Sequence, residues 1–441
     1  MEFDRDQFER KIADGSIHVG VLGLGYVGLP LALTFVERAS IRVTGFDIDE
    51  RKIDMIARGE TYIAHVHADR LVSEAAKRLF AATTDFSRLG EPDALIIAVP
   101  TPLTPQREPD MRYVEQTARA ISSHLRRGQL VVLESTTYPG TTDGPLRQIL
   151  EQSGLRCGQD FLLAFSPERE DPGNQKFSTA TIPKVVGGVD PVSTEVAAAL
   201  YARALDKVVT VASARTAEAT KLTENIFRAA NIALVNELKV IYERMGIDIW
   251  DVLDAASTKP FGFMRFNPGP GIGGHCIPLD PFYLTWKARE FGIATRFIEL
   301  AGEINLSMPR YVVEKLRDAL DGHGKSLRGS RILVLGLAYK KDIGDSRESP
   351  SFEIIELLLA HKAVVAYHDP FIPAAPAMRS WPSLPPLHSV PLTAATLQSC
   401  DAVIIATDHS TVDYELVAKI APLVVDTRGV FRARRDNVVK A

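Results

Sequence analysis

The sequence Gly23-Leu24-Gly25-Tyr26-Val27-Gly28 predicts an α/β fold for the N-terminal part of this chain of 441 residues. It directly follows the apolar run Ile17 to Leu22 and leads into Leu29 to Glu37, which has the apolar periodicity of a helix. In such a strand-to-helix turn the first glycine makes the tight bend. The second lets a pyrophosphate approach the backbone, and the third lets the helix pack on the strand. The N–H groups at the helix start then bind the pyrophosphate, so the turn predicts a dinucleotide-binding domain.

The residue after the second predicted strand indicates which dinucleotide binds. Ile41 to Phe46 predicts that strand, and Asp47 follows it, 19 residues after Gly28. A carboxylate at this place accepts hydrogen bonds from the ribose hydroxyls and repels the 2′-phosphate of NADP. NAD is therefore the expected cofactor. The predicted cofactor-binding residues here are Gly23, Gly25, Tyr26, Val27, Gly28, Asp47 and the nearby Lys52.

The two ends of the chain share one pattern of buried strands. Arg331 to Gly336 mirrors His18 to Gly23, and Asp401 to Ala406 echoes Asp93 to Ala98 almost letter for letter. Leu423 to Thr427 echoes Val131 to Ser135 in the same order. Buried parallel strands resemble one another anyway, but agreement in order as well as type favours two doubly wound α/β domains. The fold class is thus α/β, with two Rossmann-like parallel-sheet domains.

A helical segment separates these two domains. Between Thr216 and Met245, apolar residues recur at intervals of three and four, which predicts one long helix with Thr216 as its N-cap and Gly246 as its stop. The stripe comprises Leu222, Ile226, Ala230, Ala233, Leu234, Leu238, Ile241 and Met245. A second helix is expected from about Asp248 to Ser257. A long helix of this kind packs on both domains or on a second subunit, and we expect a homodimer through it.

These patterns divide the chain into three parts. We expect an NAD-binding domain over residues 1–212, a central helical dimerisation segment over 213–310, and a second Rossmann-like domain over 311–441. At the N-terminus, Phe3, Phe8 and Ile12 suggest a short arm that lies on the first domain.

Composition excludes several classes of protein. The net charge of −4 argues against a protein that binds nucleic acid by neutralising phosphates. No apolar run is long enough to span a membrane, and the charged N-terminus lacks an apolar signal region. The three cysteines are far apart, with no spacing that suits zinc, so no metal site is expected. We expect a protein of the reducing cytoplasm with no nucleic-acid or membrane partner.

The most unusual segment of the chain runs from Asn267 to Asp280. Four glycines and two prolines precede His275 and Cys276, which indicates special backbone angles and close approach of a ligand. Cys157 and Cys400 have the surroundings of buried cysteines in strands, whereas Cys276 lies in a loop. A loop cysteine in an NAD enzyme suggests aldehyde oxidation through a thioester, which water then hydrolyses to an acid.

Lys221 and Asn225 are four residues apart on the predicted long helix, so their side chains point the same way. From this spacing alone, a solvated helix face is the better interpretation. His275 is adjacent to Cys276, and neighbouring side chains diverge, so we do not expect it to act as the base of the thiol.

The chain resembles the UDP-glucose/GDP-mannose dehydrogenase family from about Ile17 to Arg428. These enzymes convert the C6 alcohol of a nucleotide sugar into a carboxylate in a four-electron oxidation. The resemblance rests on GLGYVGLP (23–30), VPTPL (99–103), EST (134–136), SPER (166–169), AEATKLTEN (217–225), GPGIGGHCIPLDP (269–281), LGLAYKKDIGDSRESP (335–350) and DTRG (426–429). It implies that the C-terminal domain binds the nucleotide sugar and that the product serves polysaccharide biosynthesis.

The resemblance also implies roles for individual residues. Cys276 would be the nucleophile, and Lys221 and Asn225 would stabilise the oxyanion and contact the substrate. Asp280 and Glu168 would position or activate water for hydrolysis, with Thr136 in the same network. The base of the first oxidation stays open. Thr101, Thr136 and Arg347 would contact NAD, and the predicted sugar-binding set is Glu168, Lys221, Asn225, Arg265, Gly273, Lys340 and Arg428.

The identity of the sugar follows from a finer resemblance. Many members that act on UDP-glucose or GDP-mannose have lysine before the aspartate of the cysteine loop, where this chain has Leu279. The segments GGHCIPLDPFYLTWKA (273–288), SPEREDPGN (166–174) and KPFGF (259–263) resemble members that act on UDP-N-acetylhexosamines, closest to the UDP-N-acetylglucosamine 6-dehydrogenases. UDP-N-acetylmannosamine, UDP-N-acetylgalactosamine and UDP-glucose remain alternatives.

Two other functions are compatible with a Rossmann domain joined to helices. A two-electron dehydrogenase of the 3-hydroxyacid type needs neither a loop cysteine nor a second Rossmann-like domain. A non-catalytic NAD-binding protein would have no need of Cys276, Lys221, Asn225 and Asp280. This chain has the loop cysteine and the second domain that the first alternative does not need, and the four residues that the second alternative does not need. Their presence argues against both alternatives.

Overall fold

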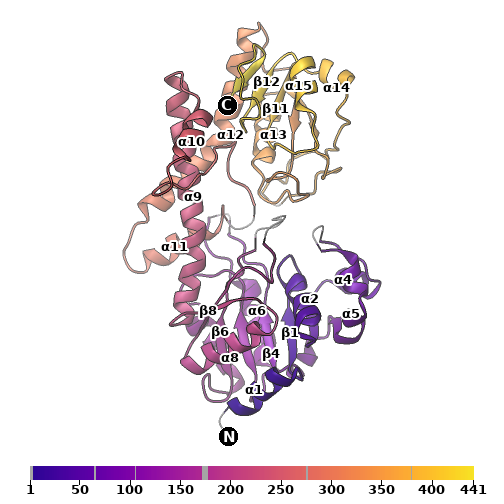
Figure 1. The fold of residues 1–441 in the computed structure, drawn as a ribbon, viewed down its shortest axis with the longest axis vertical. Helices are drawn as coiled ribbons and strands as arrows, with labels where there is room; N and C mark the ends of the chain where they lie inside the picture. The colour runs from indigo at the N-terminus through magenta and orange to yellow at the C-terminus, as the bar shows by residue number, and fades with distance from the viewer. Residues whose placement is uncertain (1–2, 64–65, 105, 171–176, 275–276, 379) are drawn as a thin grey trace. The chain divides into compact units, whose positions relative to one another are not determined.

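The computed structural model describes residues 3–63, 66–104, 106–170, 177–274, 277–378 and 380–441. Contacts divide the chain into two compact units. The first comprises Met1–Glu224 with Phe282–Ile293, and the second comprises Asn225–Pro281 with Ala294–Ala441. In Figure 1 each unit contains one sheet with helices packed against it.

The sheet of the first unit has the strand order β3-β2-β1-β4-β5-β6-β7-β8. Neighbouring strands run parallel except β6 and β7, which are antiparallel. The strands are β1 (His18–Leu22), β2 (Arg42–Phe46), β3 (Phe80–Thr83), β4 (Ala94–Ile97), β5 (Leu130–Leu133), β6 (Leu162–Phe165), β7 (Lys184–Gly188) and β8 (Val208–Thr210).

Helices connect these strands and cover the sheet. The α-helices are α1 (Arg5–Asp14), α2 (Gly28–Ala39), α3 (Glu50–Ala57), α4 (Ala68–Val72), α5 (Glu74–Leu79), α6 (Arg112–Ser122), α7 (Arg147–Leu150) and α8 (Pro191–Ala202). Short turns of other helix types are η1 (Phe86–Gly90), η2 (Thr142–Leu146) and η3 (Glu151–Ser153).

Both faces of this sheet are buried, which explains why its strands read as continuous apolar runs. One core joins alternate strand residues such as Val19 and Val21 to α1, α2 and α8. The opposite core joins Leu22 and Leu95 to α6 and α7. The predicted N-terminal arm is helix α1, whose Phe8 and Ile12 are buried in the first of these cores.

The second unit holds a parallel five-stranded sheet with the order β10-β9-β11-β12-β13. Its strands are β9 (Arg331–Leu335), β10 (Val364–His368), β11 (Ala402–Ile405), β12 (Val424–Asp426) and β13 (Val438–Lys440). Its helices are α10 (Ile249–Ala256), α12 (Arg296–Gly322), α13 (Pro350–Ala360), α14 (Ala394–Gln398) and α15 (Tyr414–Ile420), and α9 (Ala214–Arg244) and α11 (Asp280–Arg289) run from one unit into the other.

The predicted repeat of two Rossmann-like domains is confirmed. The order β10-β9-β11-β12 repeats β2-β1-β4-β5. Equivalent aspartates also make the same bond: Asp93 accepts from the N–H of His18 at 3.1 Å, and Asp401 accepts from that of Arg331 at 2.8 Å. Because an aspartate at this place satisfies the first N–H of a central strand, its letter-for-letter recurrence has a structural cause.

The long helix differs in two details from its prediction. α9 begins at Ala214, so Thr216 is not its N-cap; Ser213 Oγ accepts the Thr216 N–H at 3.2 Å and caps the helix instead. Gly246 has φ +73, as a helix stop requires. The apolar stripe also divides, because Leu222 and Ala233 are buried while Leu234, Ile241 and Met245 are exposed.

The contacts give two units, with a boundary inside α9 after Glu224, rather than three. The division into residues 1–212, 213–310 and 311–441 therefore remains a prediction. Among the described residues, no helix is both long and apolar enough to cross a membrane.

Candidate functional site

The glycine turn after β1 has the geometry of a pyrophosphate-binding loop. Gly23 has φ +93, and a Cβ there would lie 2.6 Å from the carbonyl oxygen of Ala98. A Cβ on Gly28 would lie 1.9 Å from the carbonyl oxygen of Gly23. Around Gly25, in contrast, a Cβ would meet no atom of the described protein within 4 Å. Two glycines are thus required by the turn itself, and the third leaves room for a ligand at the start of α2.

Asp47 lies at the end of β2 and is buried beside this turn. Its Oδ2 accepts the Leu24 N–H at 2.9 Å and the Lys52 ammonium at 2.7 Å, and its Oδ1 accepts the Asp49 N–H at 3.0 Å. The carboxylate is therefore fixed against the turn in which the predicted cofactor residues lie. Tyr26 and Val27 are half-buried in that turn. The residues present fit an NAD molecule.

Thr101 follows β4 and is buried. Its carbonyl oxygen accepts the hydroxyl of Tyr283, a residue of α11, at 2.9 Å. Thr136 follows β5 and is half-buried. Both predicted NAD contacts therefore come after central strands of the parallel sheet, at the edge where ligands of such sheets bind.

Glu168 and Lys221 lie together at the same edge. Glu168 comes from the segment after β6, and Lys221 from the first turns of α9. The Lys221 ammonium donates to the carbonyl oxygen of Glu168. Glu168 Oε1 accepts the N–H groups of Arg169 at 2.7 Å and Glu170 at 2.5 Å. Lys221 is only 6% exposed, so the solvated-face interpretation of this residue is wrong.

A charged cluster next to Glu168 was not predicted from the sequence. The Lys184 ammonium lies 3.0 Å from Glu134 Oε1 and 3.5 Å from Glu168 Oε2, and Tyr201 donates its hydroxyl to Glu134. Lys184, Glu134 and Tyr201 are all buried. Glu134 belongs to the EST motif, but nothing in the sequence marks Lys184, because it reads as the start of an ordinary apolar strand.

In the second unit, Asn225 and Asp280 form the corresponding polar pair. Asn225 Nδ2 donates to Asp280 Oδ2 at 2.5 Å, and both residues are buried. Asn225 therefore does not lie on a solvated face either. It follows Lys221 by four residues on α9, which places it one helical turn further along.

The glycine loop packs closely on residues of the second Rossmann-like domain. The Gly274 N–H donates to the carbonyl oxygen of Arg347 at 2.9 Å. A Cβ on Gly273 would lie 2.5 Å from the Tyr339 Cβ, so only glycine fits there. Arg347 itself pairs with Asp345 at 2.6 Å. The loop backbone is thus fixed immediately before His275 and Cys276, which lie outside the described residues.

The remaining predicted sugar contacts are also in the second unit. Lys340 is half-buried in the segment after β9. Arg428 follows β12 and donates from Nε to the Ala406 carbonyl at 2.7 Å, and its Nη1 would lie 2.7 Å from a Cβ on Gly269. Arg265 pairs with Asp254 and donates to Asn267 Oδ1 at 2.9 Å. Gly273, Lys340 and Arg428 therefore all adjoin the glycine loop or the turns after central strands, whereas Arg265 is held by a surface ion pair.

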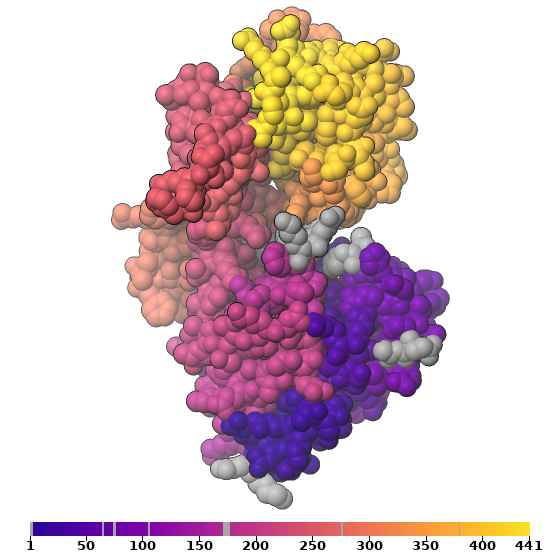
Figure 2. Space-filling view, viewed as in Figure 1, coloured from indigo at the N-terminus to yellow at the C-terminus, as the bar shows by residue number. Residues whose placement is uncertain are grey.

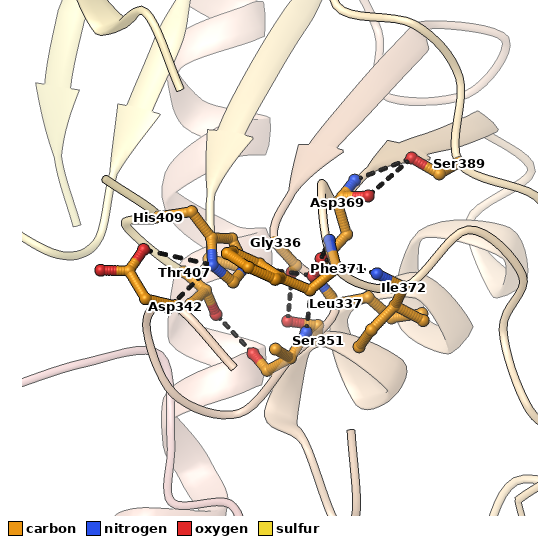
Figure 3. Close-up of polar contacts among 12 residues, drawn as sticks. Gly336, Leu337, Asp342, Ser351, Asp369, Phe371, Ile372, Ser389, Thr407 and His409 are labelled. Carbon is orange, nitrogen blue, oxygen red and sulfur yellow. Dashed lines mark hydrogen bonds and ion pairs between the residues drawn. The ribbon is translucent and has the colours of Figure 1, made fainter. Parts of the chain in front are cut away.

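The second domain has its own strand-to-helix turn but uses the aspartate differently (Figure 3). Asp369 Oδ2 accepts from the N–H groups of Leu337 at 2.7 Å and Ala338 at 2.9 Å, and contacts His409 Nε2 at 3.1 Å. Oδ1 accepts two further N–H groups, from residues 371 and 372. A carboxylate with five such contacts has little capacity left for ribose hydroxyls, so this domain does not repeat the NAD site.

The other two cysteines are buried, as expected, but neither belongs to a strand. Cys157 lies in a turn that makes an isolated bridge to Phe161, and Cys400 lies between α14 and β11. Burial raises the pKa of the Cys157 thiol to about 12, so it is protonated at neutral pH.

Three family models match the chain in sequence order. They describe the NAD binding domain, over residues 17–205, the central domain, over 215–307, and the UDP binding domain, over 333–433, of one family. The chain belongs to the UDP-glucose/GDP-mannose dehydrogenase family. It is an NAD-dependent nucleotide-sugar dehydrogenase, and the expected enzyme class, fold and cofactor are confirmed.

Several members of this dehydrogenase family are similar over nearly the whole chain. The UDP-N-acetyl-D-glucosamine 6-dehydrogenase of Pseudomonas aeruginosa is 37% identical, over 89% of this chain and 91% of its own. The UDP-N-acetyl-D-mannosamine dehydrogenase of Escherichia coli is 36% identical, over 94% and 99%. Among solved structures, a UDP-D-ManNAc dehydrogenase from Pyrococcus horikoshii is 31% identical, with a TM-score of 0.85, over 96% and 98%.

Proposed function

We propose that this dehydrogenase oxidises the C6 alcohol of UDP-N-acetylglucosamine to the uronic acid in two hydride transfers, through a thiohemiacetal and a thioester on Cys276. The observation that carries the proposal is the pairing of catalytic side chains around α9, where Lys221 contacts Glu168 and Asn225 contacts Asp280. NAD, held by the turn from Gly23 to Gly28 and by Asp47, would supply the hydride acceptor for both oxidations.

The proposed reaction proceeds in four steps. The alcohol loses a proton and a hydride to become an aldehyde, and the Cys276 thiolate adds to its carbonyl carbon. A second hydride leaves the thiohemiacetal, which becomes a thioester. Water then adds to the thioester carbon, the C–S bond breaks, and the carboxylate and the thiolate are released. The net change is one water consumed, two NAD reduced and three protons released.

The side chains of the described residues suit these steps. The ammonium of Lys221 and the amide of Asn225 are buried donors, which stabilise an oxyanion better than exposed donors do. Glu168 and Asp280 are carboxylates that can orient a water or accept its proton. On this proposal Thr136, Thr101 and Arg347 contact NAD, and Arg265, Gly273, Lys340 and Arg428 contact the nucleotide sugar.

The choice of an N-acetylated sugar is supported by the relatives. The two curated relatives described above are named for UDP-N-acetylglucosamine and UDP-N-acetylmannosamine, and a third, from Ralstonia nicotianae, is named an NDP-N-acetyl-D-galactosaminuronic acid dehydrogenase. The local sequences 273–288 and 259–263 favour the first of these sugars. UDP-N-acetylmannosamine and UDP-N-acetylgalactosamine are the alternatives that the experiment must include.

The test is the number of NADH formed per sugar consumed, over a panel of UDP-N-acetylhexosamines and UDP-glucose. Two NADH per UDP-N-acetylglucosamine, with loss of turnover in Cys276→Ala, is the expected result. One NADH per sugar would refute the four-electron scheme, and a preference for UDP-glucose would refute the N-acetyl assignment. Tight NAD binding without any turnover would identify a non-catalytic protein.

We also propose that the enzyme is a homodimer through the central helices. Leu234, Ile241 and Met245 of α9 are between 45% and 63% exposed, and Phe297 and Leu300 of α12 are 85% and 52% exposed. Figure 2 shows the end of α9 and α10 at the surface of the second unit. Large apolar side chains exposed on helices are typical of a protein interface.

A further inference from the structure

The buried lysine at the start of β7 lies where the sheet changes direction. β7 runs antiparallel to β6, so its first residue, Lys184, meets the carboxyl end of β6. Glu168 comes after that end, and Glu134 comes after the neighbouring end of β5. The topology therefore places a lysine of the only antiparallel pair in the described sheet between two carboxylates of the parallel strands.

Lys184 keeps its charge in this position. Burial would lower its pKa, but the attraction of Glu134, at 3.0 Å, and Glu168, at 3.5 Å, outweighs this effect and raises the pKa. A buried ammonium of this kind is retained only where its partners compensate for the loss of water. Glu134 is the stronger partner, and it also accepts a hydrogen bond from Tyr201.

The cluster holds both oxygens of Glu168. Backbone N–H groups of Arg169 and Glu170 bind Oε1, and Lys184 lies next to Oε2. Near this carboxylate also lie Glu134, which directly follows β5, the neutral phenol of Tyr201 on α8, and Lys221 on α9, whose ammonium donates to the Glu168 carbonyl. Arg169 pairs with Glu224 of α9 at 2.5 Å. The neighbouring Glu170 carboxyl has its pKa raised to about 8 by burial and by Glu168, so it adds little negative charge at neutral pH.

We propose that Lys184 is a positioning residue for thioester hydrolysis: it holds the Glu168 carboxylate in a fixed orientation, so that Glu168 accepts a proton from the attacking water. The oxygen of that water bonds to the thioester carbon as the proton moves to Glu168, and the C–S bond to Cys276 then breaks. Glu134 fixes the Lys184 ammonium by its ion pair, and Tyr201 in turn holds Glu134 through a hydrogen bond. This inference rests on the function proposed above, because it concerns the last step of that reaction.

A purely structural ion pair predicts a different phenotype. Loss of a structural pair would destabilise the fold and slow the hydride transfers and the hydrolysis alike. A positioning role affects only the step that uses the Glu168 carboxylate. The readouts that separate them are therefore the rate of hydrolysis relative to the rates of the hydride transfers, and the recovery of that rate in a variant that keeps the positive charge.

The experiment compares wild type with Lys184→Met and Lys184→Arg, and uses Lys11→Met as the matched control. Lys11 pairs with Asp93 at 2.8 Å, away from Glu168. Single-turnover NADH formation and the intact mass of the protein are followed with UDP-N-acetylglucosamine from pH 6 to 10. In Lys184→Met we expect near-normal NADH bursts, a roughly tenfold or larger slowing of hydrolysis, and an accumulated acyl-enzyme.

Lys184→Arg should restore the rate of hydrolysis, and Lys11→Met should match wild type. Equal slowing of all steps, or hydrolysis unchanged in Lys184→Met, would overturn the inference. If Lys184→Met does not fold, Lys184→Gln carries the same expectations, because it keeps polarity without charge.

The two proposals fail in different ways. Wild type that forms two NADH per sugar with normal hydrolysis in Lys184→Met refutes the role of Lys184 alone. Wild type that fails to form two NADH refutes the four-electron function itself.

Discussion

Asn225 donates from Nδ2 to Oδ2 of Asp280 at 2.5 Å, and this buried bond joins the middle of α9 to the first residue of α11. Asp280 is also the last residue of the glycine-rich segment that begins at Asn267, so the same bond fixes the end of that segment. An amide in this place orients the carboxylate and, on the proposed mechanism, has its second N–H available for the oxyanion.

Asn225→Ala should therefore lower kcat about 100-fold or more, as expected when one donor to an oxyanion is lost. Steady-state kinetics and the Kd for NAD measure the effect, and the Kd should change less than threefold. Asn231→Ala is the matched control, since Asn231 lies on the same helix and donates to the Phe227 carbonyl rather than to Asp280. A kcat within threefold of wild type would remove Asn225 from the proposed mechanism.

The second prediction concerns the choice between NAD and NADP. Asp47→Asn keeps an oxygen that can accept the Leu24 N–H but removes the charge that repels a 2′-phosphate. It also leaves the Lys52 ammonium without its carboxylate partner at 2.7 Å. The KM for NAD should rise about tenfold, and kcat/KM for NADP should rise by a similar factor.

The measurement is kcat/KM for both cofactors in wild type and variant. Arg51→Asn is the control, because Arg51 is exposed and pairs with Asp49 rather than Asp47. Wild-type turnover with NADP as efficient as with NAD would contradict the role of Asp47.

The third prediction concerns the assembly. If the exposed apolar side chains of α9 form the subunit interface, then Leu234→Glu with Ile241→Glu should place charges in it and yield monomers. Sedimentation equilibrium should give twice the 48.4 kDa chain mass for wild type and the chain mass for the variant. Ile48→Glu tests a side chain that is 81% exposed in the first unit, and it should remain a dimer.

The sequence predicted most of the fold because the signals are local. Buried parallel strands are continuous apolar runs, and Gly23 and Gly28 are required by the bend itself. Asp47 could be predicted in the same way, since its spacing from Gly28 follows from the length of one helix and one strand. The residues quoted from the family motifs were found by resemblance, and their roles stay proposals.

Contacts between distant segments could not be predicted. Lys184 meets Glu134 and Glu168 only because β7 runs antiparallel, and an apolar run carries no sign of its direction. In α9, periodicity placed Leu234 in the apolar stripe, but Leu234 is exposed, whereas the polar Asn236 and Lys239 are buried. Asn236 Nδ2 donates to Oδ1 of Asn305 on α12 at 2.9 Å. Part of the contact between these two helices is therefore a polar pair, which an apolar periodicity does not predict.

The fourth prediction concerns His409, which binds the backbone of Asp342, two residues after Lys340. Its Nδ1 accepts the Asp342 N–H at 3.0 Å, so its Nε2 carries the proton donated to Asp369 (Figure 3). Asp342 has φ +59, a left-handed conformation that costs about 1 kcal/mol in a residue other than glycine. We expect His409→Ala to release this segment and to raise the KM for the nucleotide sugar about tenfold, with the KM for NAD unchanged.

Initial-rate kinetics with each substrate varied in turn measure the two constants. His361→Ala is the control, because His361 is exposed at the end of α13. A parallel rise in both KM values would mean that His409 acts on the stability of the protein rather than on the sugar site.

The last prediction concerns Lys239, which is 4% exposed on α9 and whose ammonium has no hydrogen-bond partner among the described residues. Burial lowers its pKa from 10.5 to about 8, and the nearby Asp426 and Glu243 offset this effect only in part. Below pH 8 the ammonium is charged in both the folded and the unfolded protein, so the full cost of its burial is present. Between pH 8 and 10.5 the folded protein releases the proton first, and the free energy of unfolding rises with pH.

Lys239→Met should remove this cost, because a buried charge without a hydrogen-bond partner among the described residues is replaced by an apolar side chain of similar length. Urea denaturation at pH 7 should show a gain of about 3 kcal/mol or less in the free energy of unfolding. The gain should shrink as the pH approaches 10, whereas the exposed control Lys419→Met should change stability by less than about 0.5 kcal/mol at either pH. A loss of stability in Lys239→Met at pH 7 would show that the ammonium is compensated in the folded protein.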